Sequence, residues 1–189
     1  MKTVIYVHGY GSDMTAYKVG SLKKRLPEGY NVVGQNYNYD SQSPTSIISS
    51  LKQFALTFLN SEDDQIFFVG SSLGGFIVLN VLKSINAKAV LVNPSVSPHI
   101  NLKKRNNKFS KEYYNIARSL PNGNFRNVLC LVSDDDDVID VGGLDSFNFK
   151  KVEISGGGHR MTNFDSYVDT IIGYFEKNSL LEEYGLFLD

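Results

Sequence analysis

The chain carries a serine in a setting that predicts a nucleophile. Residues 70–74 read Gly-Ser-Ser-Leu-Gly, a G-x-S-x-G pattern with Ser72 at its centre. The apolar run 65–69 before it predicts a buried strand, and residues 75–82 after it predict a buried helix. A sharp strand-to-helix turn would lift Ser72 Oγ into a cleft and aim the following N–H groups at an oxyanion. The pattern is short, so its weight depends on partners elsewhere in the chain.

Three histidines are candidates for the base that such a serine needs. His8 follows the first predicted strand, where we expect it to shape a turn, and His99 is predicted at the surface of an irregular region. His159 comes after three glycines, residues 156–158, and precedes the last predicted helix. A flexible glycine run can deliver an imidazole to the edge of a cleft, so we favour His159 as general base over a capping or surface role.

The acid that orients the base is predicted among the four adjacent aspartates 134–137. Neighbouring carboxylates repel each other, so an isolated run of this kind is typical of a solvated acidic loop. Here the order Ser72, then aspartate, then His159 is the chain order of α/β-hydrolase triads. Composition does not choose among Asp134, Asp135, Asp136 and Asp137, and it leaves Asp140 open as well.

Two backbone N–H groups are candidates for an oxyanion hole. The N–H of Leu73 comes directly after Ser72, and the N–H of Tyr10 lies after His8 and Gly9 at the end of the first predicted strand. Loss of one such donor typically raises a barrier by about 3–4 kcal/mol, so a second donor matters.

Composition is that of an ordinary globular protein. A length of 189 residues suits a single domain, and 19 basic against 20 acidic residues leave a formal net charge of −1. This balance gives no general attraction to nucleic acid or to an anionic membrane. No apolar run reaches the ~18 residues of a membrane span, and no signal segment is recognised, so we expect a cytoplasmic protein. The single cysteine, Cys130, excludes an internal disulfide and is predicted in the core.

Strand-like and helix-like segments alternate along the chain. The predicted strands cover residues 3–7, 31–37, 65–69, 87–92, 128–132 and 150–154. The predicted helices cover residues 14–26, 73–84 and 162–176, with a further one that is capped by Ser43, begins at Pro44 and has apolar residues from 47 to 59 on one face. This alternation predicts a mostly parallel central sheet with helices on both faces, with reactive groups beyond the carboxyl ends of the strands.

Two regions stand apart from the alternation. Residues 95–126 include the basic stretch 102–108 and are interpreted either as a solvated helical excursion or as a lid beside the site. Residues 178–189 form an acidic, aromatic tail that is a candidate contact with the body or with another subunit of a homo-oligomer.

Together these features resemble the α/β-hydrolase superfamily, and more narrowly the small YqiA-type bacterial esterases. The resemblance rests on five segments that occur in the family order: Tyr-Val-His-Gly-Tyr-Gly-Ser (6–12), Val-Gly-Ser-Ser-Leu-Gly-Gly-Phe (69–76), Val-Asn-Pro-Ser (92–95), Asp-Asp-Val-Ile-Asp (136–140) and Gly-Gly-His (157–159). It implies a compact α/β-hydrolase with a small or absent cap, with Ser72 as nucleophile and His159 as base. The acid of the family stands two residues before a valine, which selects Asp136.

The resemblance also implies a serine esterase that acts on short acyl esters, with thioesters as further candidates. A Ser-His-Asp triad and an acyl-enzyme need neither a metal nor another cofactor. Two alternatives stay open: an interaction protein that keeps the fold without catalysis, and an acyltransferase or peptidase that uses the same triad.

Overall fold

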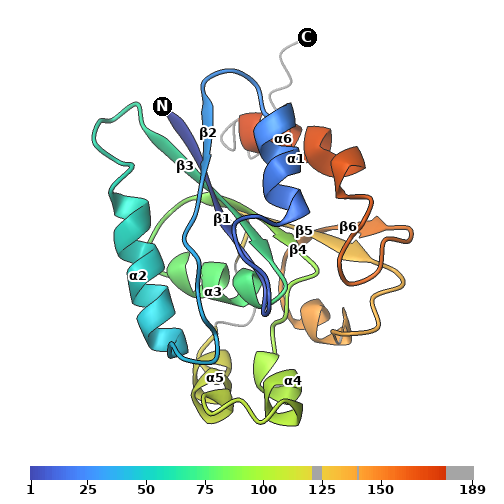
Figure 1. Ribbon diagram of the computed structural model, residues 1–189. Helices are drawn as coiled ribbons and strands as arrows, with labels where there is room; N and C mark the ends of the chain where they lie inside the picture. Colours follow the sequence, from blue (N-terminus) through green and yellow to red (C-terminus); the bar gives the residue numbers. More distant parts are fainter. Residues whose placement is uncertain (121–124, 140, 178–189) are drawn as a thin grey trace.

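The computed structural model describes residues 1–120, 125–139 and 141–177, so the predicted tail 178–189 lies outside the described residues. Six strands form one sheet in the order β2-β1-β3-β4-β5-β6, and every neighbouring pair is parallel (Figure 1). The strands are β1 (Lys2–Val7), β2 (Tyr30–Val33), β3 (Gln65–Ser71), β4 (Lys88–Val92), β5 (Val128–Ser133) and β6 (Lys150–Ile154). The predicted parallel sheet is therefore confirmed.

Helices cover both faces of the sheet (Figure 1). Helices α1 (Tyr17–Arg25) and α6 (Val168–Glu176) pack on one face, and α2 (Pro44–Leu56) and α3 (Leu73–Val81) pack on the other. Successive residues of a strand point to opposite faces, so Val4 joins the cluster under α1 and α6 while Ile5 joins the cluster under α2 and α3. Both faces of a parallel sheet are buried, which explains the continuous apolar runs in the sequence.

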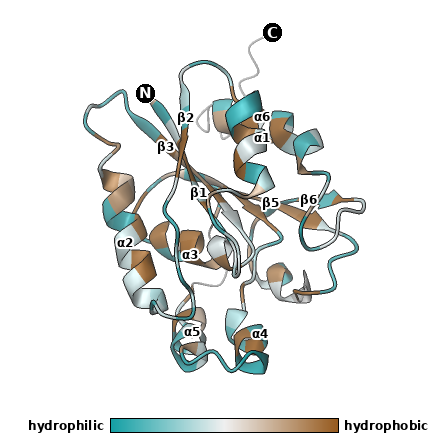
Figure 2. Cartoon of the chain, in the orientation of Figure 1, coloured by the Kyte–Doolittle hydropathy of each residue, from teal (hydrophilic) through white to brown (hydrophobic). Residues whose placement is uncertain are grey.

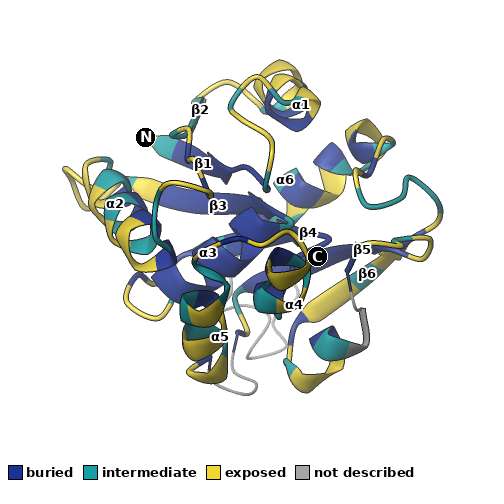
Figure 3. Cartoon of the chain, turned by 60° about the horizontal axis from the view of Figure 1, so that its bottom comes forward, coloured by how far each residue is buried: buried dark blue, intermediate teal, exposed yellow. Residues whose placement is uncertain are grey.

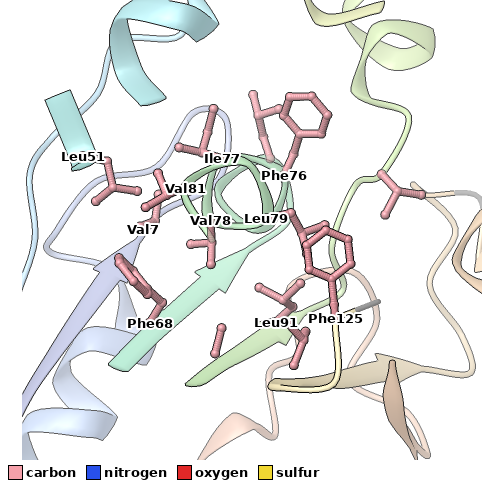
Figure 4. Close-up of a cluster of buried hydrophobic side chains, with 14 of the residues drawn as sticks. Val7, Leu51, Phe68, Phe76, Ile77, Val78, Leu79, Val81, Leu91 and Phe125 are labelled. Atoms are coloured by element: carbon pink, nitrogen blue, oxygen red, sulfur yellow. The ribbon is translucent and has the colours of Figure 1, made fainter. Parts of the chain in front are cut away.

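Helix α3 is buried along its whole length. All nine of its residues are buried, and Figure 2 shows much of the helix in the brown of hydrophobic residues. Figure 4 shows its side chains between Phe68 and Leu91 of the sheet and Leu51 of α2. Burial of apolar surface contributes roughly 25 cal/mol per Å², so a helix enclosed on all sides is held firmly. This burial fixes the turn that contains Ser72, which directly precedes α3.

The two largest differences between predicted and observed element boundaries are at the end of β2 and at the start of α6. Strand β2 ends at Val33 rather than at residue 37, because Tyr37 donates its N–H to a histidine ring instead of to a neighbouring strand. Helix α6 begins at Val168, after a single 3₁₀ turn, Phe164–Tyr167. The predicted start of α2 is confirmed: Pro44 is its first residue, and Ser43 Oγ accepts a hydrogen bond of 3.2 Å from the Ser46 N–H.

The region that interrupts the alternation folds into two short helices, α4 (Pro98–Lys104) and α5 (Ser110–Arg118). They lie next to each other beyond the main body, with largely exposed outer surfaces (Figure 3). The helical excursion is thus confirmed for the described part of residues 95–126, and a lid motion stays a prediction. No helix in the described parts of the chain combines the length and apolar character that crossing a membrane requires.

Candidate active site

Ser72 occupies a strained turn between β3 and α3. Its backbone has φ 52° and ψ −119°, a conformation that residues with a Cβ rarely adopt and that costs about 1–3 kcal/mol. Hydrogen bonds hold the turn from two directions. The Ser72 N–H donates to the Val92 carbonyl (2.9 Å), and the Ser72 carbonyl accepts from the N–H groups of Gly75 (3.0 Å) and Ser95 (3.1 Å).

The glycines of the pattern allow segments to approach the turn closely. A Cβ at Gly74 would lie 2.1 Å from the Val7 carbonyl oxygen, and a Cβ at Gly70 would lie 2.8 Å from Gly75 Cα. Both distances are far below van der Waals contact. The spacing of glycines around the serine therefore follows from the packing of β1, β3 and α3 at this point.

A histidine and a carboxylate form a hydrogen-bonded series with the serine hydroxyl. His159 Nε2 lies 3.0 Å from Ser72 Oγ, and His159 Nδ1 lies 2.8 Å from Asp136 Oδ2. The Asp136 side chain is fully buried and the His159 side chain is one-fifth exposed. An ionised carboxylate only accepts hydrogen bonds, so the Nδ1–H donates to it and Nε2 is left to accept the serine O–H. This arrangement can move a proton from Ser72 to His159.

The second oxygen of Asp136 is also occupied. Asp136 Oδ1 accepts the N–H groups of Val138 (2.8 Å) and Ile139 (3.1 Å), so the turn after β5 fixes the carboxylate plane. Asp140, which the sequence left open as an acid, lies outside the described residues.

The other three aspartates have different surroundings. Asp134 Oδ1 accepts the Gly156 N–H (2.9 Å), and Asp135 Oδ1 accepts the Gly158 N–H (2.8 Å), so both hold the glycine run that precedes the histidine. Asp137 is exposed and lines the cavity above the serine. Of the four, Asp136 is the one whose carboxylate hydrogen-bonds the imidazole.

His8 is a structural residue of the turn after β1. Its buried ring accepts the Tyr37 N–H at Nε2 (2.9 Å), and Nδ1 lies 2.8 Å from the Gly9 carbonyl oxygen. The Tyr39 hydroxyl donates to the His8 carbonyl (2.6 Å). Burial lowers the pKa of His8, which favours the neutral ring that these contacts require. The expected turn-shaping position is confirmed.

His99 and Cys130 lie away from the serine. His99 is partly exposed in α4, where its ring packs edge-on against Tyr114 at 5.0 Å between centroids. Cys130 is fully buried in β5, as predicted, and burial raises the pKa of its thiol.

Both predicted oxyanion donors belong to residues that line the same cavity as Ser72. Leu73 is the first residue of α3, where backbone N–H groups have no partner within the helix. A Cβ on Gly9 would lie 3.1 Å from Ser72 Cβ, so the turn that carries Tyr10 passes directly beside the serine. Within the described parts of the chain, neither the Leu73 N–H nor the Tyr10 N–H donates to a protein acceptor.

Asn93 is a residue of this site to which the sequence gave no role. It follows β4, is fully buried and has a positive φ of 44°. Its amide nitrogen lies 3.1 Å from the carbonyl oxygens of both Gly158 and His159, and its Oδ1 accepts the Ser133 N–H at 2.8 Å. Asn93 therefore ties the histidine loop to β5. An amide residue directly after a buried strand was the signal available in the sequence.

A cavity of about 860 Å³ lies above Ser72. Its walls come from the turns after β1, β3, β4, β5 and β6 and from α4. It therefore opens at the carboxyl ends of the strands, where ligands bind in open α/β sheets, and its volume suits a small organic molecule. Within residues 1–120, 125–139 and 141–177, no group of three or more His, Cys, Asp or Glu side chains is placed to hold a metal ion.

A parallel sheet wrapped by helices, with a serine on a strained turn between β3 and α3, defines an α/β-hydrolase fold. Residues 3–176 match the uncharacterised protein family UPF0227, and the chain belongs to that YqiA-like family. The resemblance drawn from the sequence is thereby confirmed.

Solved structures show the same fold at low sequence identity. Est1E from Butyrivibrio proteoclasticus, solved with ferulic acid bound, superposes with a TM-score of 0.75 at 12% identity, over 93% of this chain and 89% of that one. A monoacylglycerol lipase from Paleococcus ferrophilus gives 0.67 at 14% identity, over 91% and 94%. A lipase-esterase related protein from Clostridium acetobutylicum gives 0.64 at 17% identity, over 92% and 94%.

Proposed function

We propose that this protein is a serine hydrolase that cleaves carboxylic esters through an acyl-enzyme. The observation that carries the proposal is the continuous hydrogen-bonded series from Ser72 Oγ through His159 to Asp136, with distances of 3.0 and 2.8 Å. An esterase and lipases among the structurally similar proteins support the same reaction class. Short acyl esters are the proposed substrates, thioesters are included, and the proposed location is the cytoplasm.

In the first half-reaction, His159 Nε2 takes the proton of Ser72 Oγ while the oxygen attacks the acyl carbon. The N–H groups of Leu73 and Tyr10 stabilise the negative charge that forms on the carbonyl oxygen. Asp136 stabilises the imidazolium, which then gives its proton to the departing alkoxide. The ester bond breaks, the alcohol leaves and the acyl group stays on Ser72.

In the second half-reaction, water replaces the alcohol. His159 takes a proton from water, hydroxide attacks the acyl carbon, and the same two N–H groups stabilise the second oxyanion. The proton returns to Ser72 Oγ as the acyl–oxygen bond breaks. The products are one carboxylic acid and one alcohol, and the protein is regenerated.

A fluorophosphonate probe tests the nucleophile directly. We expect stoichiometric labelling of the folded protein at Ser72, and loss of both labelling and 4-nitrophenyl acetate turnover in Ser72→Ala. Ser71→Ala is the matched control, because this neighbouring hydroxyl is directed toward Tyr6 and should not react. An unlabelled Ser72 in folded protein would refute the proposal. It would favour instead an interaction protein, which a pull-down would reveal.

A substrate panel separates the reactions that one triad supports. Esters, thioesters, amides and an added acceptor alcohol should be compared by kcat/KM on the same preparation. We expect esters to be cleaved fastest. Faster amide cleavage would indicate a peptidase, and preferential transfer to the added alcohol over water would indicate an acyltransferase.

A further inference from the structure

We propose that Lys104, Arg105 and Arg160 form an anion-binding subsite beside Ser72, so that the preferred substrates are esters carrying a carboxylate or a phosphate. This inference rests on the proposed ester hydrolysis. All three cationic side chains line the cavity that contains Ser72. Lys104 and Arg105 stand at the end of α4, and Arg160 directly follows the histidine that contacts the serine.

The lining of the cavity carries an excess of positive charge, whereas the chain as a whole does not. Its described lining contains the three cations and one acidic side chain, Asp137, whereas the complete sequence has a formal net charge of −1. Asp136 presents no carboxylate oxygen to a ligand in the cavity, because its side chain is fully buried and hydrogen-bonded to His159. A cleft lined by one sign of charge attracts ligands of the opposite sign.

These cations also form no ion pair with any acidic residue in the described parts of the chain. Lys104, Arg105 and Arg160 are all exposed. Elsewhere on the surface, cations do find acidic partners: Lys2 pairs with Glu176 at 2.8 Å. The cavity therefore presents positive charge that a ligand can neutralise.

The guanidinium of Arg105 stacks on the ring of Tyr10, and hydrogen bonds hold that ring in place. Its guanidinium carbon lies 5.3 Å from the centroid of the Tyr10 ring. The Tyr10 hydroxyl donates to Asp40 Oδ1 (2.7 Å), which also accepts from the Asn107 amide (3.1 Å). A guanidinium stacked on a ring keeps its N–H edge available for a carboxylate or a phosphate, which it binds with two parallel hydrogen bonds.

Tyr10 belongs both to the proposed oxyanion hole and to the proposed anion subsite. Tyr10 supplies a proposed oxyanion donor through its backbone and supports Arg105 through its ring. Arg105 therefore lines the same cavity as Ser72, where the ester group would bind. Leu102, Val138 and Ile139 line the same cavity and provide apolar contacts for the hydrocarbon between the two groups.

Matched ester pairs test the proposal for each half of the substrate. Mono(4-nitrophenyl) glutarate, with a charged acyl group, is compared with its methyl ester, and 4-acetoxybenzoate, with a charged leaving group, with methyl 4-acetoxybenzoate. 4-Acetoxyphenyl phosphate is compared with phenyl acetate. We expect at least one charged ester to be preferred by about tenfold in kcat/KM, and expect about 0.5 M NaCl to reduce that preference by screening.

Single substitutions test whether the preference for charged esters comes from the cations of the cavity. Arg105→Gln keeps a polar side chain of similar shape and should reduce the charged-to-neutral ratio by about tenfold, as loss of a charge-assisted hydrogen bond predicts. Lys103→Gln is the control, because Lys103 is an exposed cation of the same helix that does not line the cavity. The ratio should stay unchanged in this control. Asp137→Asn removes the competing carboxylate and should increase the ratio.

The outcomes separate this inference from the proposed function. If neutral esters are hydrolysed and no charged ester is preferred, the esterase proposal stands and the anion subsite is wrong. If no ester is hydrolysed, calorimetric titration of the Ser72→Ala protein with mono(4-nitrophenyl) glutarate still tests the subsite. Binding that weakens in Ser72→Ala/Arg105→Gln supports it, and absence of binding, or binding that the second substitution leaves unchanged, overturns it.

Discussion

The side-chain amide of Asn93 lies 3.1 Å from the backbone carbonyl oxygen of His159. This contact joins the end of β4 to the loop after β6, across the end of β5. The imidazole approaches Ser72 from a loop that contains three glycines with positive φ, which by themselves allow many conformations. Asn93 restricts that freedom at the residue where the ring must be placed.

We predict that Asn93 acts as a positioning residue for His159. Asn93→Gly should lower kcat by about tenfold or more with a smaller change in KM, since a displacement of about 1 Å in a reacting group can cost about a hundredfold. Glycine accepts the φ of 44° without strain, so this variant isolates the loss of the side chain. Asn93→Ala adds backbone strain and should also lower the unfolding temperature.

Steady-state kinetics and thermal unfolding check this prediction together. A positioning role requires that kcat of Asn93→Gly falls more than its stability loss explains at the assay temperature, and that the pH profile of kcat changes as the ring environment changes. Full kcat in a folded Asn93→Gly protein contradicts the prediction.

We predict that Asp136 and its neighbour Asp135 differ sharply in their effect on rate. Asp136→Asn should lower kcat by about 10³–10⁴-fold, because an amide cannot stabilise the imidazolium and favours the wrong tautomer. Asp135→Asn removes charge at the neighbouring position while an amide oxygen can still accept the Gly158 N–H, so it should reduce kcat by less than about tenfold.

Pre-steady-state and steady-state assays of both variants give the comparison. Circular dichroism should confirm that each is folded. A silent Asp136→Asn would show that the buried carboxylate does not act on the histidine. An Asp135→Asn that loses as much activity would show that the loss is not specific to Asp136.

We predict opposite effects of alanine at two helical glycines. Gly74→Ala places a Cβ 2.1 Å from the Val7 carbonyl oxygen, so backbone must move and the unfolding free energy should fall by about 3 kcal/mol or more. Gly20→Ala in α1 meets no atom within 4 Å and should raise it by about 0.5–1 kcal/mol through helix propensity. Urea unfolding measures both changes, and a tolerated Gly74→Ala would contradict the packing described for the turn.

We predict a pH-dependent contribution of Lys18 to stability. Burial against the Phe164 ring lowers the pKa of Lys18 from 10.5 to about 8, and its ammonium donates to the Arg160 carbonyl. Between pH 8 and 10.5 the unfolded chain binds one more proton than the folded chain, so the unfolding free energy rises with pH across this window. Below pH 8 the cost of burying the charge is fully present.

Comparison with Lys18→Met isolates the contribution of the Lys18 charge to the unfolding free energy. The wild type should gain about 2–3 kcal/mol relative to the variant between pH 8 and pH 10, from about 1.4 kcal/mol per pH unit. Urea unfolding at the two pH values gives the difference. A constant difference between the two proteins would show that the lysine is not desolvated in the folded state.

Much of the fold was predictable because it depends on neighbours along the chain. Apolar runs specified the strands, Ser43 and Pro44 marked the start of α2, and the glycines around Ser72 indicated a tight turn. The positions that differed depend on distant contacts. Residues 34–37 look like strand continuation in the sequence, but the buried ring of His8 takes the Tyr37 N–H and so competes with the sheet.

The sequence by itself determined which side chains were candidates, since the order of serine, aspartate and histidine and the glycines beside them are local features. Residue chemistry alone left Asp134, Asp135, Asp136 and Asp137 equivalent, because adjacent carboxylates are alike until the fold gives each a different partner. The family resemblance selected Asp136, and only the tertiary structure places that carboxylate, rather than its neighbours, against the His159 ring. It also brought Asn93 to His159 and Lys104, Arg105 and Arg160 to one cavity. Such contacts join residues distant in the chain, and only packing in three dimensions fixes their distances.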